Sequence, residues 1–267
     1  MVRASARAIP GLHLAAGIGQ SGPMIRLDRD GHVATITLNR PAARNALSVS
    51  GWLALAETAR EVAASDARAV LLRSDLPVIF SAGADIGEMQ GFEGGDATRF
   101  REAMRAGIEA VAALPMPCLA VIDGGCFGAG IALVLACDIR VAGDGAQFAS
   151  TPAKLGLGYP REDVARLIAQ IGKGNAARML FTGEIVDAAD AQAMGLVELR
   201  WEEPEPLARA FADRIAANAP GAMKLLKRTL SDPGDPALDA AFDACFSGAE
   251  FAEGVTAFRE RRRPSYP

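Results

Sequence analysis

Two segments, each an apolar run that leads into a cluster of small residues, constrain the fold of this chain most. Leu76–Phe80 and Pro117–Ile122 have the composition of short buried strands. Phe80–Ile86 and Asp123–Gly130 follow them, and each leads into helix-compatible sequence. Small residues let a ligand approach the backbone, and a helix start offers unpaired N–H groups and a partial positive charge. Two such donors aimed at one point would form an oxyanion hole; the alternative is two ordinary glycine-rich turns.

The first 140 or so residues alternate between strand and helix patterns. Met24–Asp28 and Val33–Leu38 are predicted to form a hairpin around Gly31. Ser48 is the predicted N-cap of a helix that runs to about Ala64. The predicted inner face of this helix holds Trp52, Leu53, Leu55 and Ala56. The other predicted elements are strands at Ala69–Arg73 and Asp138–Ala142 and helices at Asp96–Leu114 and Ile131–Cys137. Short links between alternating elements indicate an α/β fold.

From about Arg161 onward the pattern becomes almost wholly helical. A lone strand is predicted at Val197–Arg200. The predicted helices are Glu162–Ile171, Asn175–Leu180, Ala188–Met194, Glu203–Asn218, Gly221–Leu230 and Pro236–Phe246. We therefore divide the chain into residues 1–22, a core at 23–200 and a helical region at 201–267.

Composition narrows the classes of function. The 267 residues are half hydrophobic, which suits one large domain or a domain with a small appendage. A net charge of −4 and only four lysines argue against nucleic acid or an anionic membrane as partner, and against an RNA-binding role. The four cysteines (Cys118, Cys126, Cys137 and Cys245) form no CxxC or Cys/His pattern, so no metal site is predicted. Free cysteines of this kind predict a reducing compartment, and we expect a cytoplasmic location.

Residues 1–22 differ from the rest of the chain. They carry Arg3 and Arg7, no acidic residue, and an apolar part broken by Pro10 and Gly11. We predict a disordered extension, with a transit peptide as the alternative because such peptides are rich in arginine and poor in acids. No apolar stretch reaches the roughly 20 residues that a membrane-spanning helix needs.

The two constraining segments carry a resemblance to a known family. Phe80–Ile86 resembles the F-x-A-G-A-D-[IL] signature of the crotonase, or enoyl-CoA hydratase/isomerase, superfamily. Asp123–Asp138 is similar to its N-G-x-x-x-G-x-G-x-x-L-x-x-x-C-D segment. The other similar segments are Leu38–Leu47, Phe181–Gly183, Ala193–Val197 and Phe258–Pro264. The resemblance extends in order from about Met24 to Tyr266.

The resemblance implies a fold and a partner. Members of the superfamily have a spiral of ββα turns, and their C-terminal helices pack against neighbouring subunits of a trimer. It therefore implies a homotrimer or a dimer of trimers that processes an acyl-CoA thioester. Coenzyme A would enter as part of the substrate, and no separate cofactor is expected.

The resemblance also implies how such an enzyme would work. The N–H groups of Ala84 and Ala129 stand where the family stabilises a thioester enolate. Ala132 and Pro152 stand where family hydratases carry two glutamates that activate water. A positioned acid or base contributes about 10²–10⁴-fold, so ordinary hydration should be impaired. Decarboxylation of a malonyl-type thioester needs no enzyme base and is one alternative; non-catalytic acyl-CoA binding is another.

Two downstream side chains are candidates to replace the glutamates. Tyr159 resembles a tyrosine that helps to hold the substrate carboxylate in a branch that includes methylmalonyl-CoA decarboxylase, although that branch has histidine where this chain has Ala84. A half-buried structural tyrosine is the alternative. Glu162 is the candidate acid or base; alternatively it is a first-turn residue favoured by the dipole of the next helix.

The remaining site predictions concern coenzyme A. Arg44 lies near where relatives contact the CoA nucleotide. The backbone of Ala84, Asp85, Ile86 and Gly87 is expected to flank the pantetheine and the thioester. Phe258 and Arg263 occupy positions from which a neighbouring subunit holds the adenine and the 3′-phosphate, whereas Arg261 and Arg262 fit a solvated basic tail.

Overall fold

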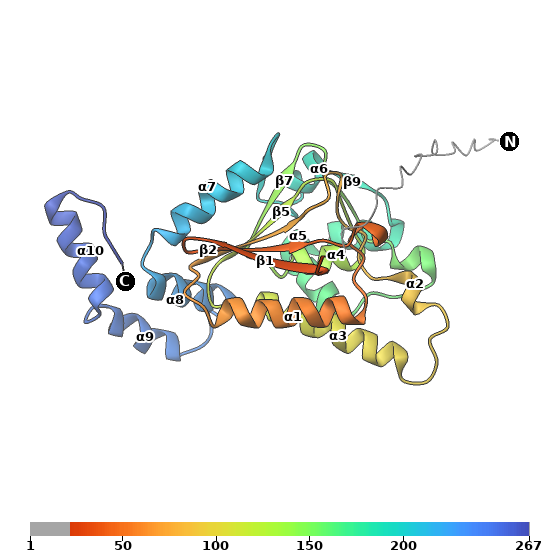
Figure 1. Ribbon diagram of the computed structural model, residues 1–267, viewed down its shortest axis with the longest axis horizontal. Helices are drawn as coiled ribbons and strands as arrows, with labels where there is room; N and C mark the ends of the chain where they lie inside the picture. The colour runs from red at the N-terminus through yellow and green to blue at the C-terminus, as the bar shows by residue number, and fades with distance from the viewer. Residues whose placement is uncertain (1–21, 267) are drawn as a thin grey trace.

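The computed structural model describes residues 22–266, and a six-stranded sheet forms its centre (Figure 1). The strands lie in the order β1-β2-β3-β5-β7-β10. Their bounds are Ile25–Asp30, Val33–Leu38, Ala69–Ser74, Cys118–Ile122, Ile139–Gly143 and Leu199–Trp201. β1 pairs antiparallel with β2, as the predicted hairpin requires, and the other neighbours pair in parallel. The strand predicted to stand alone near Val197 is thus β10 at the edge of this sheet.

A smaller sheet runs in the order β4-β6-β8-β9. These strands are Ile79–Ser81, Gly125–Phe127, Gln147–Ala149 and Val186–Asp187. Each of β4, β6 and β8 comes a few residues after a strand of the larger sheet and precedes a helical segment, so the chain repeats a strand, strand, helix unit. This arrangement confirms the predicted α/β fold with a ββα spiral. β6 lies inside the second glycine-rich segment, where only a turn was predicted, because backbone pairing with β4 and β8 creates it without an apolar pattern.

The predicted helices are all present, and the structure differs from the predictions in three places, one of which is a short unpredicted helix after the first glycine-rich segment. They are α1 Val49–Ala63, α2 Ile86–Met89, α3 Asp96–Ala112, α4 Ala129–Val134, α5 Arg161–Thr182, α6 Ala188–Ala193, α7 Pro204–Ala216, α8 Pro220–Ser231, α9 Ala237–Cys245 and α10 Ala249–Glu260, with 3₁₀ turns at Pro41–Ala43 and Pro152–Leu155. Two predicted helices are the halves of α5, which bends at Gly172. α10 was not predicted, because most of its apolar side chains are exposed and make no single buried stripe.

The N-terminus of α1 forms as predicted, since the Ser48 side chain accepts a hydrogen bond from the Gly51 N–H at 3.2 Å. Trp52 and Leu55 are fully buried, but Leu53 is 49% exposed, so its place on the inner face was wrong. A helix turns about 100° per residue, which carries the residue after Trp52 away from the core.

Helices cover both faces of the larger sheet. Figure 1 shows α7 on one side and α1 and α3 on the other. On the α7 side, Ala208 and Ala212 pack against Val33, Leu71 and Leu119. α7 is therefore part of the body although it lies in the predicted helical region, whereas α9 and α10 stand off the body (Figure 1). The domain limits at 22 and 200 remain predictions.

No helix in the described part of the chain is long and apolar enough to cross a membrane. The predicted disordered extension falls almost entirely on residues 1–21, which lie outside the described residues.

Candidate active site

The two glycine-rich segments touch each other along their backbones. Gly83 has φ +93°, and a Cβ built on it would lie 2.5 Å from the carbonyl oxygen of Phe127 and 2.8 Å from the nitrogen of Ala129. No real Cβ tolerates these distances, so only glycine allows the first segment to lie against the second. The packing places Ala84, the next residue, beside the start of α4.

Both of the N–H groups that the sequence singled out are unbonded. Leu47 bonds to the residues on either side of Ala84: its N–H donates to the Gly83 carbonyl at 2.8 Å, and its carbonyl accepts from the Asp85 N–H at 3.0 Å. The Ala84 N–H itself has no acceptor among residues 22–266. Ala129 is the first residue of α4, and its N–H is likewise without an acceptor in that range. Two free donors therefore stand on neighbouring backbone segments.

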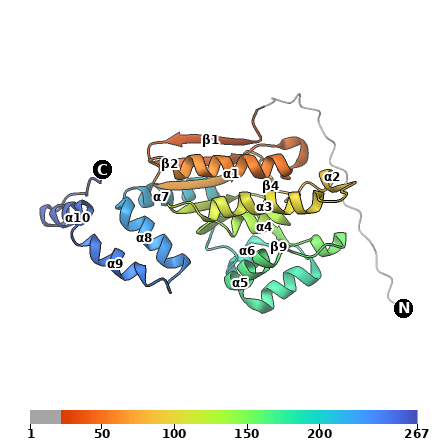
Figure 2. The same ribbon diagram turned by 90° about the horizontal axis from the view of Figure 1, so that it is seen from below.

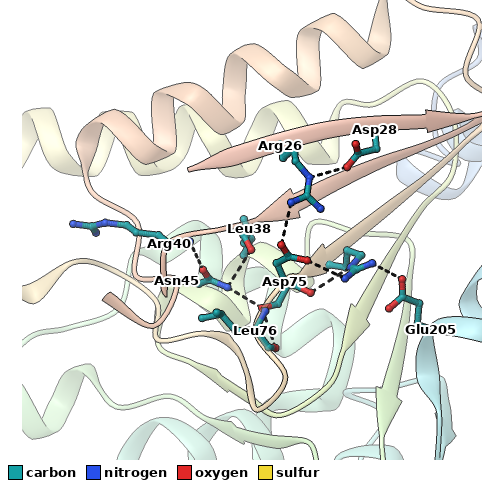
Figure 3. Close-up of polar contacts among 10 residues, drawn as sticks. Arg26, Asp28, Leu38, Arg40, Asn45, Asp75, Leu76 and Glu205 are labelled. Carbon is teal, nitrogen blue, oxygen red and sulfur yellow. Dashed lines mark hydrogen bonds and ion pairs between the residues drawn. The ribbon is translucent and has the colours of Figure 1, made fainter. Parts of the chain in front are cut away.

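A buried amide holds the first segment in place. Asn45 is fully buried and has φ +56°, a conformation that asparagine adopts more readily than most residues. Its Oδ1 accepts from the N–H of Arg40 at 2.7 Å, and its Nδ2 donates to the Leu38 carbonyl (Figure 3). The same Nδ2 also donates to Ser74 Oγ and to the Phe80 carbonyl. One side chain thus ties the loop before α1 to the ends of β2, β3 and β4.

Asp85 anchors the start of α2. One carboxylate oxygen accepts from the N–H groups of Gly87 and Glu88, and the other accepts from Arg40 at 2.6 Å. Partial burial on its own would raise the pKa of Asp85, but the bonds from Arg40 and from the two N–H groups hold it below its ordinary value. Asp85 therefore stays ionised near neutral pH and serves as an N-cap and ion-pair partner.

The second segment is held by backbone bonds and one hydroxyl. Gly128, with φ +52° and ψ −123°, donates its N–H to Ala149 at 2.9 Å. Its carbonyl accepts from the Ile131 N–H at 3.0 Å and from the Tyr159 hydroxyl at 2.8 Å. Tyr159 lies just before α5, and its ring packs against the main core. Its hydroxyl is thus directed at the backbone of the second segment.

A pocket of about 530 Å³ opens beside the first segment. It brings together four residues predicted for the site: Arg44, Ala84, Asp85 and Ile86. Its wall also includes residues that the sequence reasoning missed: Phe127, Ala149, Lys154 and Ile185. In the sequence, only the charge of Lys154 could have indicated a role in binding. In the structure its Nζ donates to the Gly183 carbonyl at 2.5 Å.

Comparison with known proteins agrees with this geometry. The profile of the enoyl-CoA hydratase/isomerase family matches residues 28–267. The chain belongs to this family. It is 31% identical to the short-chain-enoyl-CoA hydratase of Clostridium acetobutylicum, across 89% of this chain and 95% of that one. It is 30% identical to the mitochondrial methylglutaconyl-CoA hydratase of Mus musculus, across 88% and 79%. The crystal structure of an enoyl-CoA hydratase from Bacillus anthracis superposes with a TM-score of 0.87 at 30% identity, covering 91% of this chain and 99% of that one.

The positions expected to carry the family's glutamates hold no acid in this enoyl-CoA hydratase/isomerase relative. Ala132 is fully buried in α4, and Pro152 begins the 3₁₀ turn after β8. Among the described residues that line the pocket, Asp85 is the one acid. The described residues also contain no cluster of His, Cys, Asp and Glu that could hold a metal.

Glu162, the other candidate acid or base, does not line the pocket. It lies in the first turn of α5, is exposed, and pairs with Arg161 at 2.8 Å. A backbone hydrogen bond at the helix start, followed by Arg161, lowers the pKa of Glu162. This placement favours the first-turn interpretation over a catalytic one.

α10, which carries Phe258, and the C-terminal segment after it, which carries Arg263, lie at the opposite end of the molecule from α2 in both views (Figures 1 and 2). Phe258 is 84% exposed and borders a second hollow of about 780 Å³ between α8, α9 and α10. A single copy of this enoyl-CoA hydratase/isomerase family protein therefore does not bring them to the pocket, and Gly87 also lies outside the pocket wall.

Proposed function

We propose that this protein binds an acyl-CoA thioester and stabilises its enolate with the N–H groups of Ala84 and Ala129. The contact of Gly83 with the Phe127–Ala129 backbone carries the proposal, because it brings the segment of Ala84 against the segment of Ala129, and neither N–H has an acceptor among the described residues. Each such donor is worth about 3–4 kcal/mol to the transition state. Arg44 and Lys154 border the pocket that Ala84 lines and would meet the CoA phosphates there.

The chemistry of the pocket favours a substrate that generates its own enolate. Hydration needs a group that exchanges protons near neutral pH, and Asp85 is held ionised by Arg40. In a malonyl-type thioester the bond to the carboxylate breaks, CO₂ leaves, and the electron pair becomes the enolate, which solvent water can then protonate. We therefore place decarboxylation first among the reactions to test, with hydration, isomerisation and non-catalytic binding as its alternatives.

Product analysis tests this assignment. Purified protein would be incubated with crotonyl-CoA, a 3-enoyl-CoA and methylmalonyl-CoA, and the products identified by mass spectrometry. Loss of CO₂ without hydration supports decarboxylation. Rapid hydration of crotonyl-CoA contradicts the argument from Ala132 and Pro152, and tight binding with no product supports a non-catalytic protein.

A substitution at the start of α4 tests the oxyanion role directly. Ala129→Pro removes one N–H donor at the first helical position, where proline is tolerated. We expect turnover to fall about 10²–10³-fold, and because the proline ring lies next to Gly83, circular dichroism should be used to check that the fold is kept. Ala129→Gly keeps the N–H and is the matched control. Equal activity of the proline variant and the wild type would remove Ala129 from the mechanism.

We also propose that the protein assembles as a trimer or a dimer of trimers in which Phe258 and Arg263 reach a neighbour's pocket. The large aromatic side chains left exposed on α9 and α10 support this arrangement: Phe242, Phe246, Phe251 and Phe258. Analytical ultracentrifugation should give a multiple of three chains, and Arg263→Ala should weaken CoA binding. A monomer with full CoA affinity contradicts the proposal. A cytoplasmic location remains a prediction from composition.

A further inference from the structure

The peptide that joins Gly128 to Ala129 connects the proposed oxyanion site to Tyr159. A peptide unit is planar, with its carbonyl and N–H on opposite edges. The carbonyl of this unit belongs to Gly128 and accepts from Tyr159, while its N–H is the donor of Ala129. Any group that fixes or polarises the carbonyl therefore also orients and strengthens the N–H.

Packing holds only one side of this peptide: Gly83 lies against the Gly128 carbonyl carbon and the Ala129 nitrogen, but Gly128 itself stands at an open position. A Cβ built on Gly128 would meet no atom within 4 Å, although the residue has a left-handed φ of +52°. Glycine at an open position has wide conformational freedom. Two hydrogen bonds hold the carbonyl: one from Ile131 within the first turn of α4, and one from Tyr159. Among the described residues, the hydroxyl is the one group from outside this segment and its helix that bonds to the carbonyl, while Ala149 of β8 accepts from the Gly128 N–H on the other side of the residue.

The surroundings of Tyr159 keep its hydroxyl a donor. Burial raises its pKa, and the nearby Asp163 carboxylate and Cys126 thiol raise it further. Asp163 is itself paired with Arg105 and lies 3.9 Å from Arg166. The proton of Tyr159 therefore stays on its oxygen through the physiological range and remains directed at Gly128.

Ser150 offers an internal comparison. Its Oγ is fully buried and has no partner of good hydrogen-bond geometry among the described residues, but it lies near enough to the Tyr159 hydroxyl to lower the pKa of that group. It makes no bond to Gly128. Ser150 thus shares the environment of Tyr159 without touching the peptide.

We propose that Tyr159 is a positioning residue that, through the Gly128 carbonyl, aims and strengthens the Ala129 N–H toward the thioester oxygen. This inference rests on the proposed oxyanion role of Ala129. It replaces direct contact with the substrate as the role of Tyr159, because the hydroxyl proton is already donated. Hydrogen bonds in a chain polarise one another, which gives the second donor more strength than a lone N–H would have.

The absorption spectrum of a bound probe tests this proposal, because it measures how strongly the thioester carbonyl is polarised. A 2,4-dienoyl-CoA absorbs at longer wavelength when its thioester carbonyl is polarised, so the shift on binding reports the strength of the two donors. Tyr159→Phe keeps the ring and removes the hydroxyl; we expect a smaller shift and a kcat lower by about three- to tenfold, with little change in KM. Ser150→Ala, the matched control, keeps the Tyr159 hydroxyl and its bond to Gly128, so the shift and kcat should change less than in Tyr159→Phe. An unchanged shift in Tyr159→Phe overturns the inference.

A second variant avoids any loss of structure. The chain has only two tyrosines, so 3-fluorotyrosine incorporated into a Tyr266→Phe background labels Tyr159 alone. Fluorine makes the hydroxyl a stronger donor, and the probe's shift should increase; an unchanged or smaller shift contradicts the inference.

Ala129→Pro separates this inference from the proposed function. If Ala129→Pro leaves the probe's shift intact, the oxyanion assignment fails, and so does the role built on it. If Ala129→Pro reduces the shift and Tyr159→Phe does not, only the role of Tyr159 fails.

Discussion

The two backbone segments of the candidate site present similar N–H groups but are held by opposite means. The segment around Ala84 is fixed by polar and charged side chains, chiefly Asn45, Asp85 and Arg40. The segment around Ala129 is surrounded by apolar walls, and Tyr159 is the one side chain that bonds to the Gly128 carbonyl. Changes in charge should therefore alter the position of the Ala84 segment, whereas the position of the Ala129 segment should depend on packing and on the Tyr159 hydroxyl.

Forcing the two segments apart should have the largest effect. Gly83→Ala places a methyl group on the Phe127–Ala129 backbone at a left-handed φ. We expect activity to fall about 10³-fold because the donors no longer converge. The variant should also lose about 2–4 kcal/mol of unfolding free energy. Turnover and urea unfolding give the two numbers.

Gly91→Ala is the matched control for this substitution. Gly91 also has a left-handed φ, of +82°, but nothing lies within 4 Å of its added methyl group. It should share the backbone strain and keep activity. Equal loss of activity in both variants would show that strain, and not separation of the segments, is responsible.

Removing the buried amide should have the next largest effect, and mainly on stability. Asn45→Ala leaves the Arg40 N–H and the Phe80 carbonyl without the Asn45 side chain, and the Leu38 carbonyl keeps its bond from the Asp75 N–H. We expect a loss of about 4 kcal/mol in the free energy of unfolding by urea. Asn175→Ala, which removes a single bond to Ile171 on α5, should cost about 1 kcal/mol or less. Similar losses would contradict the special role of Asn45.

The sequence predicted the parts of the fold that depend on local patterns. The hairpin, the Ser48 cap and most helices follow from alternation, capping residues and apolar spacing, and all are present. The strands β6, β8 and β9 and the helix α10 were missed, since the strands depend on pairing between distant segments and the helix has exposed apolar residues. The pattern of side chains along the sequence predicts neither pairing between distant strands nor a helix whose apolar residues are exposed.

The sequence predicted the backbone part of the candidate site but not the orientation of its side chains. Ala84 and Ala129 lie together because glycine and small residues mark a close approach. The orientation of Tyr159 toward Gly128 and of Glu162 toward Arg161 comes from tertiary packing, which no spacing in the sequence reveals. The role of Asn45 as a link between three strand ends was hidden for the same reason.

The electrostatic character of the first segment can be tested by pH. Asp85→Asn keeps an N-cap but loses the charge that pairs with Arg40. We expect it to lower the free energy of unfolding by about 1–2 kcal/mol at pH 7. Because the folded pKa of Asp85 lies below its ordinary value of 3.8, the wild type holds this advantage above that value and loses it as the pH falls further.

Urea unfolding between pH 7 and pH 3 checks this prediction, and the gap between wild type and variant should narrow only at the acidic end. Tyr159→Phe is the comparison from the second segment, and its unfolding free energy relative to wild type should not change over this range, because the Tyr159 hydroxyl does not ionise there. A gap for Asp85→Asn that stays constant down to pH 3 would show that the pair with Arg40 is not what holds α2.

The smallest effect should come from the outer edge of the polar network. Figure 3 shows Asp75 between Arg26 and Arg73, with Arg73 also bonded to Glu205. These side chains are partly exposed, so water screens them, and Asp75→Asn should cost less than about 1 kcal/mol in unfolding free energy. The shift of the dienoyl-CoA probe should not change, because Asp75 touches neither backbone segment. A change in that shift would mean that surface charge acts on the probe through Asn45. The difference between the Ala84 and Ala129 segments would then be a property of the whole end of the sheet.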